Sequence, residues 1–328
     1  MTNRLVLPLI ILPLYWRLQS QPEFFALFTI CIAILAFFSG LIAWMSSQGK
    51  KSAPELMART VTFWWMVALF LISLTTPPVA TVFFLGMFSA LALYEYLSFS
   101  DQRFSLPILT FVLLQVPINL ALHYLGKSSL SPVYFFLLAG LAVPTILVLE
   151  NRPDSALMRY GYLVSGLAFF VFSLGYAAAL AHQAIMILLV CFFLTEIRDL
   201  SSYWLGKGLA RLERGRPWLS RLNPKIAPLV SPNKTWGVGV LSMLLLMVLA
   251  LTLRPLLPEQ NPASLLAWAA LIGFLGLVGD LVFSMFKRQF GLKDSGTSMP
   301  GSTGLIDRID ALVLTIPATY FFFQTIPN

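Results

Sequence analysis

The residues of this chain whose types and spacing could do chemistry lie together in the segment from Gly279 to Asp310. This segment holds four acidic and four basic side chains, although only 11% of the whole chain is charged. Charged groups within or beside a bilayer cost free energy unless they are paired, hydrated or bound to a metal. We therefore take this charged segment as the candidate functional site.

Three carboxylates of the segment predict a metal site. Asp307 and Asp310 are three residues apart, which places both on one helix face just before the final apolar run. Like charges at that spacing favour a cation between them, and Mg²⁺ takes a few carboxylates while leaving other positions for water and phosphates. We expect Asp280, Asp307 and Asp310 to hold Mg²⁺, alone or with a second cation. A salt-bridge network with Arg308 is the alternative.

Basic and hydroxyl side chains around these acids predict phosphate binding. Asp280, Ser284 and Lys287 follow one another at helical spacing, so a continuous helix would carry all three on one face. The residues that we expect to bind phosphate are Ser284, Lys287, Arg288, Lys293 and Arg308.

A glycine-rich turn, residues 293–304, joins the two charged ends of the segment. Its glycines allow close backbone approach and positive φ, as a loop that wraps phosphate requires. An ordinary connector is the alternative, since Gly, Ser and Pro mark loops of every kind. The site residues that we predict in this turn are Lys293, Asp294, Ser302 and Thr303.

A second polar loop, Gly206–Thr235, adds candidate substrate-binding residues. It holds seven basic residues and one acid, so the positive-inside rule places it in the cytoplasm. Two apolar runs separate it from the charged segment, which returns the chain to the same side of the membrane. Within the loop, Ser231, Lys234 and Thr235 precede a helix, where backbone N–H groups and a lysine can hold phosphate.

Another candidate lies late in the apolar run that contains Asp199. Glu196 and Arg198 are close by, and Tyr203 falls one turn further along the same helix face. An ionisable residue inside a membrane is a functional candidate, so we predict that Asp199 and Tyr203 bind substrate. An internal Arg–Asp ion pair is the alternative.

Composition predicts the fold class. The 328 residues are 58% hydrophobic with a mean hydropathy of +0.81. Many apolar runs approach the roughly 20 residues that cross a bilayer, so we expect an all-α, polytopic integral membrane bundle with about ten transmembrane helices. The predicted spans are 24–46, 60–76, 78–98, 105–124, 132–149, 160–181, 184–205, 236–257, 263–283 and 311–326.

We divide the chain into N-terminal transmembrane helices, residues 1–182, for packing and dimerisation, and a catalytic region, residues 183–328. Met1–Trp16 is interpreted as an uncleaved anchor or interfacial helix. The cysteines and histidines have neither disulfide nor zinc-site spacing. The residues interpreted as structural are Cys31, Cys191, His123 and His182.

Together these motifs resemble the signature of the CDP-diglyceride synthetase, or phosphatidate cytidylyltransferase, family. The resemblance covers residues of about 190–312. Two shorter blocks, from Asp199 to Lys207 and from Ser231 to Thr235, are similar to the family's aspartate-to-tyrosine and Ser-Pro-Lys-Lys-Thr stretches. The signature residues at the family's spacings are Gly279, Asp280, Ser284, Lys287, Arg288, Lys293, Asp294, Pro300, Gly301, Gly304, Asp307, Arg308 and Asp310.

The resemblance implies transfer of a cytidylyl group from CTP to phosphatidic acid or a related lipid phosphate, with release of pyrophosphate, in phospholipid biosynthesis. It also implies a homodimer. We expect the protein in the bacterial cytoplasmic (inner) membrane, among membrane lipids, with its active site at the cytoplasmic face. No sequence pattern indicates a nucleic-acid partner.

Two departures from the family pattern keep other functions open. Ser302-Thr303-Gly304 stand where the family usually has His-Gly-Gly, and Gly237-Val238 follow Trp236 where a glutamate and a glycine are usual. A phosphate monoester is already anionic, so its attack needs charge neutralisation and positioning more than a strong base. The alternatives are a nucleotidyltransferase for a different lipid phosphate, a non-catalytic lipid-binding paralogue, and a transporter or channel.

Overall fold

The structure is a computed structural model in which helices dominate, as the predicted all-α class requires. It describes residues 22–49, single positions between 54 and 67, 78–100, 104–216, 218, 220, 223–257, 260–296 and 304–325. Within this part, one departure from the all-α prediction is an antiparallel hairpin of β1 (Lys225–Ala227) and β2 (Ser231–Thr235), in which Lys225 lies opposite Thr235. The hairpin belongs to the predicted basic loop. The predicted N-terminal anchor, Met1–Trp16, lies outside the described residues.

The first half of the chain forms long apolar helices, two of which contain π-helical turns. Single helices are α2 (Pro22–Ser47), α4 (Pro78–Leu97) and α5 (Leu106–Tyr124). A composite helix contains η1 (Ser128–Leu130), α6 (Ser131–Leu137), η2 (Leu138–Ala142) and α7 (Val143–Leu149). A second one contains α8 (Ala156–Gly166), η3 (Leu167–Ser173) and α9 (Leu174–Gln183).

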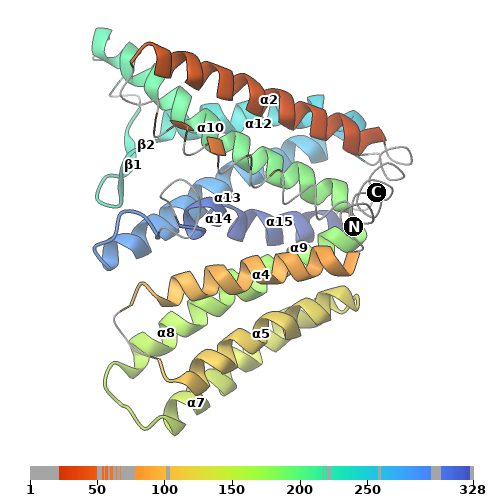
Figure 1. Ribbon diagram of the computed structural model, residues 1–328, viewed down its shortest axis with the longest axis vertical. Helices are drawn as coiled ribbons and strands as arrows, with labels where there is room; N and C mark the ends of the chain where they lie inside the picture. The colour runs from red at the N-terminus through yellow and green to blue at the C-terminus, as the bar shows by residue number, and fades with distance from the viewer. Residues whose placement is uncertain are drawn as a thin grey trace, which may run out of the picture.

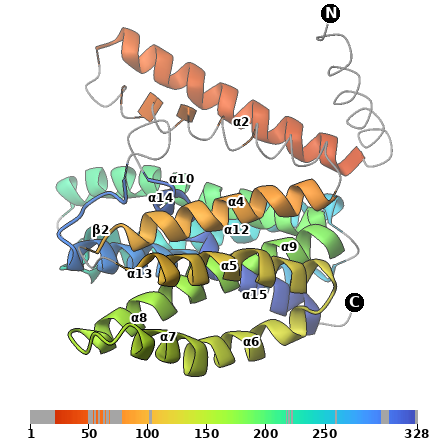
Figure 2. The same cartoon turned by 60° about the horizontal axis from the view of Figure 1, so that its bottom comes forward.

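The second half of the chain carries the predicted site on four helices and their connections. The long helices are α10 (Ile185–Gly215), α12 (Trp236–Thr252), α13 (Pro262–Gln289) and α15 (Leu312–Thr325). The short elements between them are η4 (Arg254–Leu256) and α14 (Ile306–Ile309). Figures 1 and 2 show α10, α12, α13 and α15 packed together, while α4, α5 and the α8–α9 helix form a second group that meets them through α9 and α15.

Five of the described helices are long and apolar enough to cross a membrane, which makes the chain an integral membrane protein. They are Ala26–Ser47, Leu106–Tyr124, Ser128–Leu149, Ala156–Gln183 and Pro262–Gln289. The expected number of about ten is not confirmed, because span 60–76 lies largely outside the described residues and others are short. Helix α15, for example, has 14 residues, whereas a hydrocarbon core of about 30 Å needs about 20.

A buried group of uncharged polar side chains, which we call the neutral network, lies between α5 and its neighbours. It consists of Asn119, His123, Ser128 and Ser131, all of them buried. Ser131 donates to Asn119 Oδ1 at 2.8 Å, and His123 Nδ1 lies 2.9 Å from Ser128 Oγ. The Asn119 amide donates to the carbonyl of Val171 at 2.9 Å, where the π-helical turn η3 leaves the regular hydrogen-bond pattern. The network therefore ties α5 to the α8–α9 helix.

Candidate functional site

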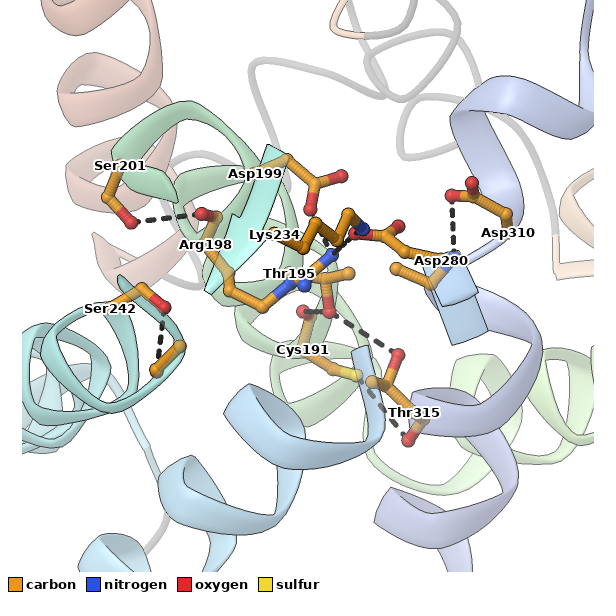
Figure 3. Close-up of polar contacts among 12 residues, drawn as sticks. Cys191, Thr195, Arg198, Asp199, Ser201, Lys234, Ser242, Asp280, Asp310 and Thr315 are labelled. Atoms are coloured by element: carbon orange, nitrogen blue, oxygen red, sulfur yellow. Dashed lines mark hydrogen bonds and ion pairs between the residues drawn. The ribbon is translucent and has the colours of Figure 1, made fainter. Parts of the chain in front are cut away.

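Three carboxylates that are distant in the sequence meet at one end of the bundle. They belong to Asp199 of α10, Asp280 of α13 and Asp310, the residue that follows α14. One oxygen of each lies within 4.8 Å of the others, and Figure 3 shows Asp199 and Asp310 on either side of Asp280. We call these three residues the acid cluster.

Glycine makes this close approach possible. A Cβ atom at Gly279 would lie 2.5 Å from the carbonyl oxygen of Asp310 and 3.1 Å from Cα of Ala311. Contacts of that length with backbone atoms do not occur in packed proteins, so any side chain at position 279 would push α13 away from the turn after α14. In the signature, Gly279 therefore lets α13 pack closely against the turn after α14, and the adjacent Asp280 supplies a carboxylate of the cluster.

Two cations are built into the acid cluster. The guanidinium of Arg198 pairs with Asp199, and it donates to Asp280 at 2.8 Å. Lys234 of β2 also pairs with Asp280. Arg198 is only 1% exposed, and it lies against Gly276, where a Cβ atom would come within 2.8 Å of Nε. Three carboxylates thus face Arg198 and Lys234, and Arg308 lines the same cavity.

The donor set of the acid cluster fits a hard divalent cation, because such ions take a few carboxylate oxygens and complete their shell with water or phosphate. Burial raises the pKa of the Asp310 carboxyl well above its usual range, and the charges of Asp280 and Asp199 raise it further. A metal ion would compete with that proton, since carboxylates bind metal when they are deprotonated. Mg²⁺ binding at these residues stays a prediction.

Asp307 differs from the expected arrangement. Its carboxylate pairs with Lys287 of α13 and accepts a hydrogen bond from the backbone N–H of Ser295 at 2.8 Å. The backbone N–H of Asp307 in turn donates to Ser295 Oγ at 3.3 Å. Asp307 thus connects the two ends of the glycine-rich turn. In the group of three acids, the structure has Asp199 where the sequence predicted Asp307.

Glu95 is a functional candidate that sequence reasoning missed. Its buried carboxylate accepts hydrogen bonds from the backbone N–H groups of Leu305 at 2.9 Å and Ile306 at 3.1 Å. Helix α4 thereby fixes the segment that carries Asp307 and Asp310. The sequence does contain a signal for this role. Glu95 is a lone acid within the apolar run 78–98, and an ionisable residue in such a run is a functional candidate.

A cavity of about 520 Å³ joins the acid cluster to an apolar region between α2 and α10. One end is charged and the other is lined by aliphatic and aromatic side chains. The predicted site residues that line the cavity are Asp199, Tyr203, Lys234, Thr235, Asp280, Ser284, Asp307, Arg308 and Asp310.

Other predicted residues lie away from the described cavity wall. Lys287 is buried in its ion pair with Asp307, and Arg288 donates to the carbonyls of Val230 at 3.4 Å and Leu292 at 3.3 Å. Arg288 therefore ties the β-hairpin to the end of α13. Lys293 and Asp294 are exposed in the following turn and Ser231 begins β2, whereas Ser302 and Thr303 lie outside the described residues.

Comparison with known proteins identifies the family. A sequence model described as the Cytidylyltransferase family matches residues 57–326. The chain is 29% identical over 313 residues, 93% of its length, to 98% of a protein of Escherichia coli (strain K12) named Uncharacterized protein YnbB. A phosphatidate cytidylyltransferase of Brucella abortus biovar 1 (strain 9-941) is 28% identical over 239 residues, which are 65% of this chain and 83% of that enzyme. One of Haemophilus influenzae (strain ATCC 51907 / DSM 11121 / KW20 / Rd) is 30% identical over 148 residues, 43% of this chain and 47% of that enzyme. The matched residues include the whole acid cluster, and the chain belongs to the cytidylyltransferase family.

Proposed function

We propose that this protein transfers a cytidylyl group from CTP to the phosphate of phosphatidic acid, giving CDP-diacylglycerol and pyrophosphate. The observation that carries the proposal is the shape and charge of the cavity. Its charged end holds the acid cluster with Lys234 and Arg308, and its other end is apolar. A substrate with a phosphate group and hydrocarbon chains matches both ends, and nucleotidyl transfer is the chemistry of the family.

The reaction forms one bond and breaks one. A phosphate oxygen of the lipid attacks the α-phosphorus of CTP, and the bond from that phosphorus to the oxygen bridging it to the β-phosphate breaks, so that pyrophosphate leaves. The nucleophile is already anionic, and the protein's main task is to hold two anions in line and neutralise them. Mg²⁺ bound by Asp199, Asp280 and Asp310 would add positive charge at the triphosphate.

The basic residues of the site have separate parts in this proposal. Lys234 is partly exposed, with 27% of its side chain accessible, so it can turn from Asp280 toward an incoming phosphate. Arg308 lines the same cavity and supplies a second cation at its charged end. Arg198 is buried beneath the carboxylates and orients Asp199 and Asp280.

The same residues indicate on which side of the membrane the site lies. Lys234 of the basic hairpin pairs with Asp280 of the acid cluster, so the site lies beside the basic loop, and basic loops favour the cytoplasmic side. We place the site at the cytoplasmic face of a bacterial inner membrane, where CTP reaches it from water and the lipid phosphate from the bilayer.

Pyrophosphate release by the purified protein in detergent, with CTP, phosphatidic acid and Mg²⁺, tests the proposal. Wild-type protein should release pyrophosphate, and Asp280→Asn should abolish the release because it removes a carboxylate of the cluster. Asp154→Asn is the matched control, since Asp154 is an exposed acid in the turn before α8. Silence of the wild type with phosphatidic acid, despite bound CTP, would contradict the proposed substrate.

A second candidate is the same transfer to a different lipid phosphate. The observation that favours it is Ser302-Thr303-Gly304 in place of the family's usual His-Gly-Gly, within the glycine-rich turn whose ends meet at Ser295 and Asp307. The sequence predicts that this turn binds phosphate, so a change of its residues is a reason to test other lipid phosphates. Turnover measured with phosphatidic acid, a lysophosphatidic acid and a polyprenyl phosphate, all at equal detergent concentration, would separate the two candidates.

A further inference from the structure

The apolar part of the cavity is bordered by α2, by α10 and by Leu56, Thr60 and Val67 of the segment between α2 and α4. From α2 it is lined by residues at helical spacing, namely Leu27, Cys31, Ile34, Leu35, Phe38 and Ile42. From α10 it is lined by Leu189, Phe192, Phe193, Ile197 and Leu200. Both sets recur at intervals of three and four residues, so each forms one continuous stripe along its helix.

Helices in a packed interior interdigitate their side chains and leave few voids larger than a water molecule. These two stripes instead border a cavity of about 520 Å³. Only 11% of the apolar stretch of α2 is buried, against 72% for Ala156–Gln183, and Figure 2 shows α2 along the outside of the bundle. The stripe on α2 therefore faces a space that an apolar molecule can fill.

The groove between the stripes continues directly into the charged end of the site. On α10 the stripe runs from Leu200 past Asp199 and Glu196, and Arg308 and Lys234 line the same cavity. The α2 stripe from Leu27 to Ile42 spans about 22 Å at 1.5 Å per residue. One leaflet of the hydrocarbon core is about 15 Å thick, so a lipid chain of ordinary length fits along it.

We propose that the groove between α2 and α10 holds one hydrocarbon chain of the lipid phosphate, and that the α2 side chains determine which chain lengths are accepted. This inference rests on the proposed function, because it takes the phosphate of the same lipid to lie at the acid cluster. The chain orients the phosphate for attack rather than strengthening binding. Moving a chain from bilayer to groove exchanges one apolar environment for another.

The first test changes the width of the groove. Leu35→Trp adds bulk inside the cavity, whereas Ala33→Trp places the same side chain on the exposed side of α2, where the larger increase in volume meets no wall of the cavity. Misplacing the phosphate should lower kcat/KM of Leu35→Trp for long-chain phosphatidic acid roughly ten- to a hundredfold. The loss should shrink as the acyl chains shorten, and Ala33→Trp should keep the wild-type chain-length profile. Equal loss at every chain length would overturn the proposal.

The second test does not depend on turnover. A phosphatidic acid analogue with a photoreactive diazirine near the end of one acyl chain is irradiated with the wild-type protein, and labelled peptides are identified by mass spectrometry. We expect labels on the α2 and α10 stripes, and competition by unlabelled phosphatidic acid. Labels confined to other helices would overturn the proposal that this groove binds the acyl chain. Labelled stripes in a protein without pyrophosphate release would leave the groove intact and contradict only the proposed function.

Discussion

The acid cluster and the neutral network are two buried polar groups in one apolar molecule, and they differ in charge and in access. The neutral network of Asn119, His123, Ser128 and Ser131 consists of uncharged side chains bonded to one another and to the backbone. In the described part of the chain, His123 Nε2 is its one atom without a hydrogen-bond partner. The acid cluster consists of ionisable side chains and opens into a cavity.

This difference indicates which of the two groups does chemistry. Apart from His123 Nε2, the neutral groups bond to one another and to the backbone, so the network stabilises the packing of α5 without a ligand. Three carboxylates that lie within 4.8 Å of one another repel when they are ionised, and a metal ion or a bound proton can relieve that repulsion. Substitutions in each group should therefore have different effects on stability, on metal binding and on turnover.

The largest effect is expected at Arg198. Arg198→Met keeps a similar chain but removes the guanidinium, which leaves Asp199 and Asp280 with less compensation. Breaking a buried ion pair in this way costs about 3 kcal/mol or more of unfolding free energy. A divalent ion that binds the folded state restores part of it. The unfolding midpoint of Arg198→Met in detergent should therefore be lower than that of the wild type in Mg²⁺-free buffer and should recover when Mg²⁺ is added. A midpoint that does not change with Mg²⁺ would refute the charge argument.

A second prediction separates Asp199 from Asp307 as a metal ligand. Asp199→Asn should weaken Mn²⁺ binding, measured by electron paramagnetic resonance, by about a hundredfold, because outer-shell changes alone reach that size. Asp307→Asn should weaken it less, since Asp307 pairs with Lys287 and Ser295. The opposite ranking would restore the grouping of Asp280, Asp307 and Asp310 that the sequence suggested.

A third prediction concerns Glu95, the residue of α4 that reaches the site. Glu95→Gln keeps its size but removes the charge and one acceptor oxygen, so one of the bonds to Leu305 and Ile306 is lost. Hydrogen bonds to charged groups contribute about 1.5–3 kcal/mol. We expect kcat to fall about tenfold through displacement of Asp310, with KM for CTP little changed. A change in KM alone would make Glu95 a substrate contact instead of a positioning residue.

The sequence was informative where the site depends on local spacing and on topology. Two predicted spans between Lys234 and Asp280 led us to expect both residues on one side of the membrane, and the two meet in an ion pair. Asp310 follows the signature turn and joins them. Loop composition, helical periodicity and the positive-inside rule were enough to bring these three residues together.

The remainder depends on how helices rotate and pack, which spacing does not encode. Asp199 replaces Asp307 in the acid cluster because Arg198 fits against Gly276 and turns that face of α10 toward α13. Glu95 meets Leu305 through backbone N–H groups 210 residues away, and such a contact leaves no side-chain pattern. The groove beside α2 depends on an empty volume, which no residue pattern reports.

The smallest effect is expected in the neutral network. Ser131→Ala removes the hydrogen bond to Asn119, and polar pairs inside membrane proteins contribute about 0.6 kcal/mol on average. We expect a small fall in the unfolding midpoint and no change in pyrophosphate release or Mn²⁺ affinity, because the network lies outside the cavity wall. If Ser131→Ala lowered turnover at unchanged stability, the two polar groups would be coupled through α9 and α15, and the division between a structural network and a chemical cluster would fail.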